Sequence, residues 1–475
     1  MVKELKAIEG QKTKIVATIG PACSSREGLL SLVKAGVDVF RLNFSHGSHE
    51  EHLEVINRIV SINEEYGTHV SILADLQGPK LRVGAMENDG IEIAPGDILT
   101  FTNEKCIGTK DKIYMSYDQF AQDVNVGEKI LVDDGKIVLE VVSTNKVNEV
   151  KLKVLFGNKL SSKKGVNLPD TNVSLPCLTE KDLIDLEFIL QQPVNWIALS
   201  FVRKAEDILD VKERIAAAGK DMLVVAKIEK PEAIKNIKEI IKVTDCIMIA
   251  RGDLGVEIPI EKLPSLQKMI IKKCIQKAKP VIVATQMMES MITNPSPTRA
   301  EVTDVANAVL DGADAVMLSG ETSVGAHPAK VVEAMNAIIL DAELHYEMMD
   351  KRTKPDPESD SYLSDVICLT APKIAEEIGA KAIIGLTVKI SSYRPSAMIY
   401  IFSEKVHMLK TLNLVRGVKC FSYDKFTTTD ETIHDTIEIL KSKGILKTGD
   451  LAVNTGSMPL HKRFKTNTVK ITIVE

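Results

Sequence analysis

The chain has 475 residues, which corresponds to roughly three domains of about 150 residues each. Sixty Lys and Arg residues against 65 Asp and Glu residues give a formal net charge of −5, which argues against a nucleic-acid-binding protein with a basic face. Aromatic residues make up only 4% of the chain, so a base-stacking platform is also not expected.

The seven cysteines are widely spaced and form no Cys-x-x-Cys pair. This pattern predicts reduced thiols rather than a disulfide framework or a zinc site. No apolar run of about 18 residues occurs, and the first residues lack the apolar core of a signal peptide. We therefore expect a cytoplasmic protein that binds neither membranes nor nucleic acids.

Eight short, continuously apolar segments predict parallel strands that are covered on both faces. Stretches with helical spacing lie between most of them, so the order of elements predicts a (β/α)8 TIM barrel. An open, doubly wound sheet is the alternative, although no G-x-G-x-x-G follows any strand. The predicted strands are residues 14–19, 39–44, 70–76, 196–201, 222–228, 246–250, 280–285 and 315–319, and the helices are residues 25–35, 49–66, 204–218, 234–242, 260–277 and 299–311.

About 120 residues separate the third and fourth predicted strands, which is too long for a loop in a compact domain. Gly-containing turns, such as the one at residues 133–135, alternate there with short apolar runs at residues 129–132, 137–142 and 150–156. This pattern predicts a small inserted β-domain. The insertion point lies at the carboxyl end of the third strand, so we interpret the insert as a lid over the site. An inert insertion is the alternative.

A polar, Pro-containing segment at residues 351–360 follows a helix-like stretch at residues 328–350 and predicts a linker. The remaining residues again alternate between helix and strand patterns, which indicates a separate α/β domain. The predicted domains are therefore the barrel, residues 1–77 and 172–345; the β-domain, residues 78–171; and the C-terminal domain, residues 346–475. The predicted elements of this last domain are residues 362–378, 382–386, 396–402, 406–414, 418–423, 431–443, 451–454 and 469–474.

Polar side chains follow several predicted strands at the ends that face the reaction in a barrel. Arg41, Asn43 and Ser45 are spaced by two residues and therefore share one face, as do Lys227 and Glu229. Charged groups in such apolar surroundings are costly to bury unless they are paired or bind metal. Solvated ion pairs at the rim of the barrel are the alternative interpretation.

Two carboxylates, Glu229 and Asp253, suit Mg²⁺ or Mn²⁺ with room for water and substrate oxygens. Histidine is absent from the strand ends, which disfavours a zinc site or a histidine-based triad. The segment SGETS at residues 319–323 contains Gly and is a candidate for binding phosphate through backbone N–H groups. Arginine, lysine and a divalent metal at one mouth together indicate phosphoryl transfer.

These motifs resemble those of pyruvate kinases, closely over the first 345 residues and more loosely beyond. The resemblance implies transfer of the phosphoryl group of phosphoenolpyruvate to ADP, giving pyruvate and ATP, by a homotetramer. It rests on TKIVATIGPA at residues 13–22, FRLNFSHG at 40–47, DLQGPKLR at 75–82, KKGVNLP at 163–169, AKIE at 226–229, ARGDLG at 250–255, ATQMMESM at 284–291 and MLSGET at 317–322.

The resemblance also implies roles for single residues. Arg41 holds the phosphate of the substrate, and Lys227 neutralises the phosphoryl group in transfer and then the enolate. Gly252, Asp253 and Thr285 bind the pyruvate end, and Thr285 helps to deliver a proton to the enolate carbon.

The metal and the nucleotide are assigned on the same basis. Glu229 and Asp253 hold the protein-bound Mg²⁺, and a second Mg²⁺ arrives with the nucleotide. Arg82 counts among the catalytic residues as well. The residues implied to contact ADP or ATP are Asn43, Phe44, Ser45, His46, Arg82 and Lys164.

The third strand departs from the pattern of many pyruvate kinases, which read DTKGPE where this chain has DLQGPK at residues 75–80. The Glu type resembles enzymes that need K⁺. The residues at the positions of their K⁺ ligands are Asn43, Ser45, Asp75 and Leu76. We expect Lys80 to place its ammonium group in or near this cation site as a fixed positive charge, so that this bacterial-type enzyme works without K⁺.

The C-terminal domain departs from the pattern as well. Pyruvate kinases activated by sugar phosphates usually carry a Ser/Thr- and Gly-rich loop after its first strand, and residues 383–395 are shorter and lack it. We therefore do not expect a fructose 1,6-bisphosphate site of the usual type, and we expect Arg394 to be structural. Another phosphorylated activator, or none, stays open.

Two other functions stay open at this point. The first is a different barrel enzyme acting on phosphoenolpyruvate or pyruvate, such as a phosphotransferase or lyase; Arg82 and Lys164 argue against it because they imply a nucleotide. The second is an inactive metabolite-binding regulator, which would be expected to lack Lys227, Glu229 or Asp253.

Overall fold

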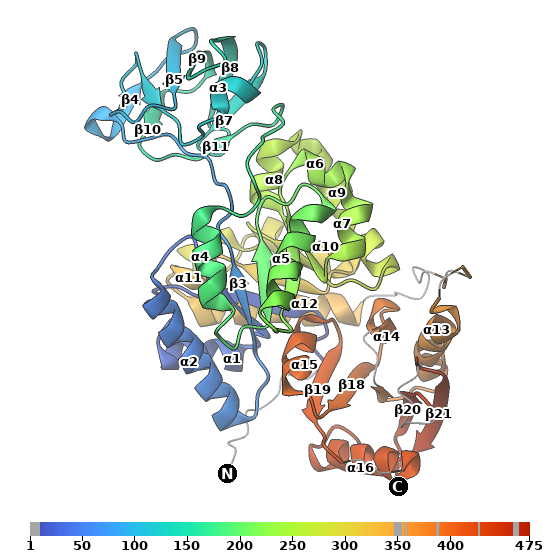
Figure 1. Ribbon diagram of the computed structural model, residues 1–475. Helices are drawn as coiled ribbons and strands as arrows, with labels where there is room; N and C mark the ends of the chain where they lie inside the picture. The colour runs from blue at the N-terminus through green and yellow to red at the C-terminus, as the bar shows by residue number, and fades with distance from the viewer. Residues whose placement is uncertain are drawn as a thin grey trace.

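The computed structural model describes residues 10–345, 354–355, 357–358, 360–385, 389–425, 428–458 and 465–475. Figure 1 shows a central barrel, a β-rich insert above one end of it and a C-terminal domain against the other side. None of the described helices combines the length and the hydrophobicity that a membrane span needs. Most of the predicted linker at residues 351–360 and the end of the predicted helix at residues 328–350 lie outside the described residues.

Eight parallel strands close a barrel, which confirms the predicted fold and rules out the open sheet. Alternate residues point to opposite faces of each strand, so Val225 lies in the barrel interior whereas Val224 and Ala226 pack under the helices. Both faces are covered, which explains the continuously apolar runs. In order around the barrel the strands are β1 (Lys14–Thr18), β2 (Val39–Asn43), β3 (Ser71–Asp75), β12 (Trp196–Leu199), β13 (Leu223–Ile228), β14 (Cys246–Ala250), β15 (Val281–Ala284) and β16 (Ala315–Leu318).

Helices cover the outside of the barrel, and most lie where the spacing predicts them. Asn236 leaves helical geometry, so two short helices, α6 and α7, replace the single helix predicted at residues 234–242. The prediction also missed α4, which a capping box between Thr179 and Asp182 begins, and α8, which starts directly at the end of β14. The helices are α1 (Arg26–Ala35), α2 (His49–Tyr66), α4 (Glu180–Ile189), α5 (Ala205–Ala217), α6 (Pro231–Lys235), α7 (Ile237–Val243), α8 (Arg251–Glu257), α9 (Leu263–Gln276), α10 (Arg299–Asp311), α11 (Gly320–Ser323) and α12 (Pro328–Leu344).

The insert has a hydrophobic core of its own, built from residues such as Leu99, Phe101 and Leu139. Its main sheet has the order β11-β7-β8-β9-β5-β6, and β10 pairs with β4. The turn predicted at residues 133–135 is present, with positive φ at all three residues. The elements are β4 (Gly90–Glu92), β5 (Ile98–Thr102), β6 (Ile113–Tyr114), α3 (Phe120–Asp123), β7 (Lys129–Val132), β8 (Ile137–Thr144), β9 (Glu149–Phe156), β10 (Lys159–Ser161) and β11 (Val166–Asn167).

The C-terminal domain is a five-stranded sheet of order β19-β18-β17-β20-β21, in which only β21 is antiparallel to its neighbour. Residues 386–388 of the loop that lacks the Ser/Thr- and Gly-rich run lie outside the described residues. The elements are α13 (Tyr362–Glu377), β17 (Ala382–Gly385), α14 (Lys389–Ser392), β18 (Met398–Ser403), α15 (Val406–Thr411), β19 (Val418–Ser422), α16 (Thr429–Ser442), β20 (Leu451–Gly456) and β21 (Thr468–Ile473).

Two buried ion pairs join the C-terminal domain to the barrel. Arg394 Nη1 and Nη2 donate to Asp314 Oδ1 and Oδ2 at 3.0 and 2.8 Å, and Nη2 also donates to the carbonyl of Gly312 at 2.7 Å. Arg416 Nη2 lies 3.3 Å from Glu343 Oε1. Both pairs are almost completely buried. Arg394 is therefore a structural residue, as expected from the sequence.

We expect Arg394→Leu to lower the free energy of unfolding by about 3–5 kcal/mol, because Asp314 then stays buried without its partner. Urea unfolding followed by the fluorescence of Trp196, which is buried in the barrel, measures this loss. Lys425→Met is the control, since its ion pair with Asp435 is exposed and should leave the transition unchanged. Equal midpoints for both variants would contradict the prediction.

Candidate functional site

The carboxyl ends of the barrel strands bring together the charged residues that the sequence predicts. Arg41, Asp75 and Lys227 come from β2, β3 and β13, Glu229 directly follows β13, and all four are largely or fully buried. Side chains from different strands thus meet in one continuous network of ion pairs.

Arg41 is held in place from two directions. Its Nε donates to Asp75 Oδ2 at 2.6 Å and its Nη1 donates to Thr18 Oγ1 at 3.0 Å. Burial alone would raise the pKa of Asp75, but the guanidinium of Arg41 and the ammonium of Lys227 outweigh it and lower this pKa. Asp75 is therefore an ionised anchor that fixes the orientation of both cations.

Lys227 lies at the centre of the network. Its Nζ is 2.7 Å from Ser200 Oγ, 3.0 Å from Glu229 Oε1 and 3.3 Å from Asp75 Oδ1. Burial would lower the pKa of Lys227, but the two carboxylates outweigh it and raise the pKa above its usual value. The side chain therefore carries a permanent positive charge at neutral pH, at a fixed position.

Glu229 uses its second oxygen to bind the backbone. Phe201 N–H donates to Oε2 at 2.7 Å, and Phe201 adopts a left-handed conformation with φ of 56° to do so. Burial raises the pKa of Glu229, Lys227 opposes this shift and Asp253 adds to it. A cation between the two carboxylates would relieve this repulsion.

Glu229 and Asp253 fit a magnesium site completed by a ligand. No group of three or more His, Cys, Asp or Glu side chains suited to a metal occurs among the described residues, so the chain offers no closed metal cage there. Mg²⁺ commonly takes one or two carboxylates and completes its shell with water and substrate oxygens. Asp253 lies in the first turn of α8 and is partly exposed, so it can reach such a ligand.

Thr285 is fixed beside Gly252 by an unusual turn. Thr285 and Gln286 both have positive φ, at 70° and 54°. Arg251 Nη2 donates to the carbonyl of Thr285 at 2.8 Å, and Gly252 N–H donates to Thr285 Oγ1 at 2.7 Å. The hydroxyl is thus oriented at the mouth of the barrel.

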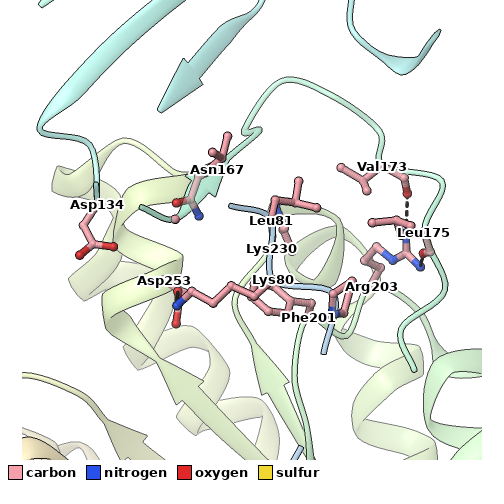
Figure 2. A pocket seen from close by; sticks show the side chains of 13 residues that line it. Lys80, Leu81, Asp134, Asn167, Val173, Leu175, Phe201, Arg203, Lys230 and Asp253 are labelled. Atoms are coloured by element: carbon pink, nitrogen blue, oxygen red, sulfur yellow. Dashed lines mark hydrogen bonds and ion pairs between the residues drawn. The ribbon is translucent and has the colours of Figure 1, made fainter. Parts of the chain in front are cut away.

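A cleft separates the barrel from the insert, and Lys80 crosses it (Figure 2). Lys80 Nζ lies 3.8 Å from Asp253 Oδ1, its only ion pair within the described part of the chain. The ammonium therefore lies beside Asp253, one of the two carboxylates predicted to bind metal, and makes no ion pair with Asp75 in the described residues.

Three of the four predicted ligands of a monovalent cation, Asn43, Asp75 and Leu76, already contact protein donors. Asn43 Oδ1 accepts from Ser45 N–H at 3.1 Å, and the carbonyl of Leu76 accepts from Ser200 Oγ at 2.7 Å. Asp75 is paired with Arg41 and Lys227. These contacts support a site whose positive charge comes from side chains.

Two predicted nucleotide residues lie on the insert, across the cleft from the barrel. Arg82 Nη1 donates to the carbonyl of Lys163 at 3.1 Å, and Lys164 Nζ lies 3.0 Å from Asp133 Oδ1. In the loop after β2, His46 is exposed and Ser45 is half-buried. The predicted nucleotide residues thus come from both the insert and the barrel.

The structure limits two sequence interpretations. Phe44 is 2% exposed and its ring stacks on His52 with the centroids 4.2 Å apart, so its side chain belongs to the core and only its backbone is left for a nucleotide contact. The segment at residues 319–323 forms α11, and the buried Glu321 carboxylate accepts the N–H of Ser319 at 2.7 Å. The carboxylate of Glu321 therefore takes the place that a phosphate would need at the Ser319 N–H.

Sequence reasoning missed two supporting residues, Thr18 and Ser200. Thr18 is the last residue of β1 and contacts Arg41, and Ser200 follows β12 and contacts Lys227. Both lie at strand ends, so the rule that selected Arg41 and Lys227 could also have selected them.

Comparisons with known proteins agree on one family. The model of the pyruvate kinase barrel domain matches residues 10–332, and that of the pyruvate kinase alpha/beta domain matches residues 365–472. The chain is 43% identical over 475 residues to a pyruvate kinase of Geobacillus stearothermophilus, covering 98% of this chain and 80% of that protein. It is 41% identical over 472 residues to a pyruvate kinase of Clostridium perfringens, covering 97% and 99%.

A solved structure gives the same result. A crystal structure of a pyruvate kinase from Cryptosporidium parvum matches with a TM-score of 0.92 and 34% identity. The match covers 98% of this chain and 97% of the other.

We expect Asp253→Asn to weaken Mn²⁺ binding by roughly 10- to 100-fold, because one of two carboxylates is neutralised. Titration of the protein followed by the electron paramagnetic resonance of free Mn²⁺ measures this change. Asp134→Asn is the control, since Asp134 lines the same cleft without belonging to the carboxylate pair. Unchanged affinity in Asp253→Asn would show that the ion binds elsewhere.

Proposed function

Since the chain belongs to the pyruvate kinase family, we propose that the barrel mouth binds phosphoenolpyruvate and that the insert binds ADP. The activity of the enzyme is the transfer of a phosphoryl group from phosphoenolpyruvate to ADP. The observation that carries this proposal is the buried ammonium of Lys227 between Asp75 and Glu229. Phosphoryl transfer depends chiefly on positioned charge, and this network provides it.

Arg41 binds the phosphate of phosphoenolpyruvate in this proposal. Asp75 and Thr18 already hold its guanidinium, so little side-chain entropy is lost when the substrate binds. Arg41 can turn its remaining N–H groups to phosphate oxygens in the paired geometry that guanidinium groups favour.

Glu229 and Asp253 hold Mg²⁺, which acts as a Lewis acid on substrate oxygens when bound. Lys227 stabilises the negative charge that develops on the phosphoryl oxygens and then on the enolate oxygen. The carboxylates of Asp75 and Glu229 outweigh burial and raise the pKa of Lys227, which favours a role as a fixed positive charge over that of proton donor. Thr285, whose hydroxyl is oriented beside Gly252, delivers the proton to the enolate carbon through water.

The insert binds the nucleotide and excludes water. Arg82 and Lys164 of the insert bind the nucleotide together with Asn43, Ser45 and His46 of the barrel in this proposal, and closure of the cleft would shield the transferring group from hydrolysis. Phe44 takes part through its backbone, because its ring is buried. A second Mg²⁺ accompanies ADP.

The domain limits given above, residues 1–77 with 172–345, 78–171 and 346–475, remain our proposal. We also propose a homotetramer in the cytoplasm. The seven cysteines are all free, which is consistent with a reducing compartment.

We expect Lys227→Met to lower kcat by roughly 10²- to 10³-fold, because the positioned charge is lost. A coupled assay that follows pyruvate formation from phosphoenolpyruvate and ADP measures kcat and tests the function itself. Lys212→Met is the control, because Lys212 pairs with Asp245 away from the predicted site residues. A kcat of Lys227→Met equal to that of the control would refute the role of Lys227.

We propose that the enzyme needs no K⁺, because most of the expected cation ligands already contact protein donors and Lys80 supplies an additional positive charge beside Asp253. Activity in buffers free of K⁺ and NH₄⁺ should equal activity in K⁺ at the same ionic strength. Choline chloride serves as the control salt. Strong activation by added K⁺ would overturn this proposal.

A further inference from the structure

A buried polar cluster outside the substrate site joins the insert to the barrel. Lys230 Nζ donates to Glu257 Oε1 at 2.6 Å, and Asn167 Nδ2 donates to the same oxygen at 2.8 Å. The side chains of Glu257 and Lys230 are 1% and 11% exposed. One carboxylate oxygen thus receives a donor from the barrel and a donor from the insert.

The cluster is adjacent in sequence to both predicted metal ligands. Lys230 directly follows Glu229, and Glu257 lies one helical turn after Asp253 at the end of α8. Asn167 is the last residue of β11 and lines the cleft together with Lys230 and Asp253 (Figure 2). The insert therefore contacts the two segments that carry the metal carboxylates.

A second contact places the insert on the same helix. A Cβ atom added at Gly135, in the turn between β7 and β8, would lie 3.9 Å from Val256 Cγ1 on α8. Asp133 of this turn pairs with Lys164 and donates its N–H to the carbonyl of Gly165 at 3.0 Å. The nucleotide lysine and Asn167 therefore belong to one rigid edge of the insert.

The carboxylate of Glu257 in this cluster lacks one hydrogen bond among the described residues, so its stability depends on the donors that remain. Glu257 Oε2 is buried and has no hydrogen-bond partner in the described structure. A buried carboxylate of this kind depends strongly on the donors to its other oxygen. Loss of the Asn167 donor should therefore release the insert at this point.

Arg203 makes a further contact, with the segment that leads from the insert back to the barrel. Its Nη1 and Nη2 donate to the carbonyls of Val173 and Leu175 at 2.5 and 2.6 Å (Figure 2). Val173 and Leu175 pack against the hydrophobic core of the insert, so these bonds are a second link between the barrel and the insert. The bond of Asn167 to Glu257 differs because it reaches the helix that carries Asp253.

We propose that Asn167, Lys230 and Glu257 form a latch that sets the position of the insert over the two metal carboxylates. They are positioning residues for ADP, because they place Lys164 opposite the barrel mouth. This inference rests on the proposed nucleotide site for its kinetic consequence and on the contacts alone for the latch itself.

Asn167→Ala tests the latch, with Asn158→Ala as the matched control on an exposed position of the same insert. We expect the KM for ADP to rise by up to roughly 10- to 150-fold, which corresponds to the loss of one hydrogen bond to a charged group. The dissociation constant of phosphoenolpyruvate with Mg²⁺, measured by calorimetry without ADP, should change less than about twofold. Hydrogen exchange should rise in residues 129–136 and 163–167 and stay constant in the barrel strands.

Variants that change the charge at positions 167 and 257 provide a specific control for the hydrogen bond between them. Asn167→Asp brings a second carboxylate against Glu257 and should raise the KM for ADP further than Asn167→Ala. Adding Glu257→Gln to Asn167→Asp restores one N–H···O bond with donor and acceptor exchanged, and it should recover most of the loss.

The outcomes separate the latch from the nucleotide site. Faster exchange in the insert with an unchanged KM for ADP supports the latch and refutes the assignment of Lys164 to the nucleotide. Unchanged exchange in Asn167→Ala overturns the latch. A parallel rise in the dissociation constant of phosphoenolpyruvate also overturns it, because it shows general damage to the barrel.

Discussion

The chemistry of this protein depends on one arrangement of charge, the contact of Asp75 with both Arg41 and Lys227 inside a closed barrel. Two cations this close would repel each other, and burial without a partner would favour deprotonation of the lysine. The Asp75 carboxylate removes both problems, since it lies 3.3 Å from Lys227 Nζ and also binds the Arg41 guanidinium. Glu229 then completes the balance. Closed parallel strands make this possible because they deliver the four side chains to one place.

Much of the fold could be predicted from the sequence, because a barrel strand covered on both faces leaves an unmistakable apolar run. The predicted strand at residues 246–250 and the predicted helices at residues 49–66 and 299–311 have the bounds that the structure shows. The helix α8 was missed since its sequence, RGDLGVE, contains two glycines and begins without a turn after β14. Two glycines give this sequence a low helix propensity, so the helical conformation depends on the packing of the segment in the barrel.

The site was predictable where strand geometry alone determines direction. Because side chains alternate between the two faces of a strand, the positions of Arg41 and Lys227 in the sequence predict that they point to the mouth of the barrel. The same alternation places the side chain of Phe44 on the opposite face from those of Asn43 and Ser45. Its burial therefore follows from the period of two that was applied to Arg41. Contacts that depend on three dimensions could not be predicted: the pairing of Lys80 with Asp253, the bond of Phe201 to Glu229 and the meeting of Asn167 with Glu257 join residues distant in sequence.

Asp314, which accepts the buried Arg394, has a consequence for the whole molecule. The same carboxylate accepts the N–H of Val281 at the start of β15, and Thr285 follows the end of that strand. A strand of four residues spans about 13 Å and is stiff along its length. The C-terminal domain is thus connected to the start of β15, and the Thr285 hydroxyl beside Gly252 follows the end of the same strand. A displacement of the C-terminal domain would therefore act on a strand of the barrel wall rather than on a surface loop.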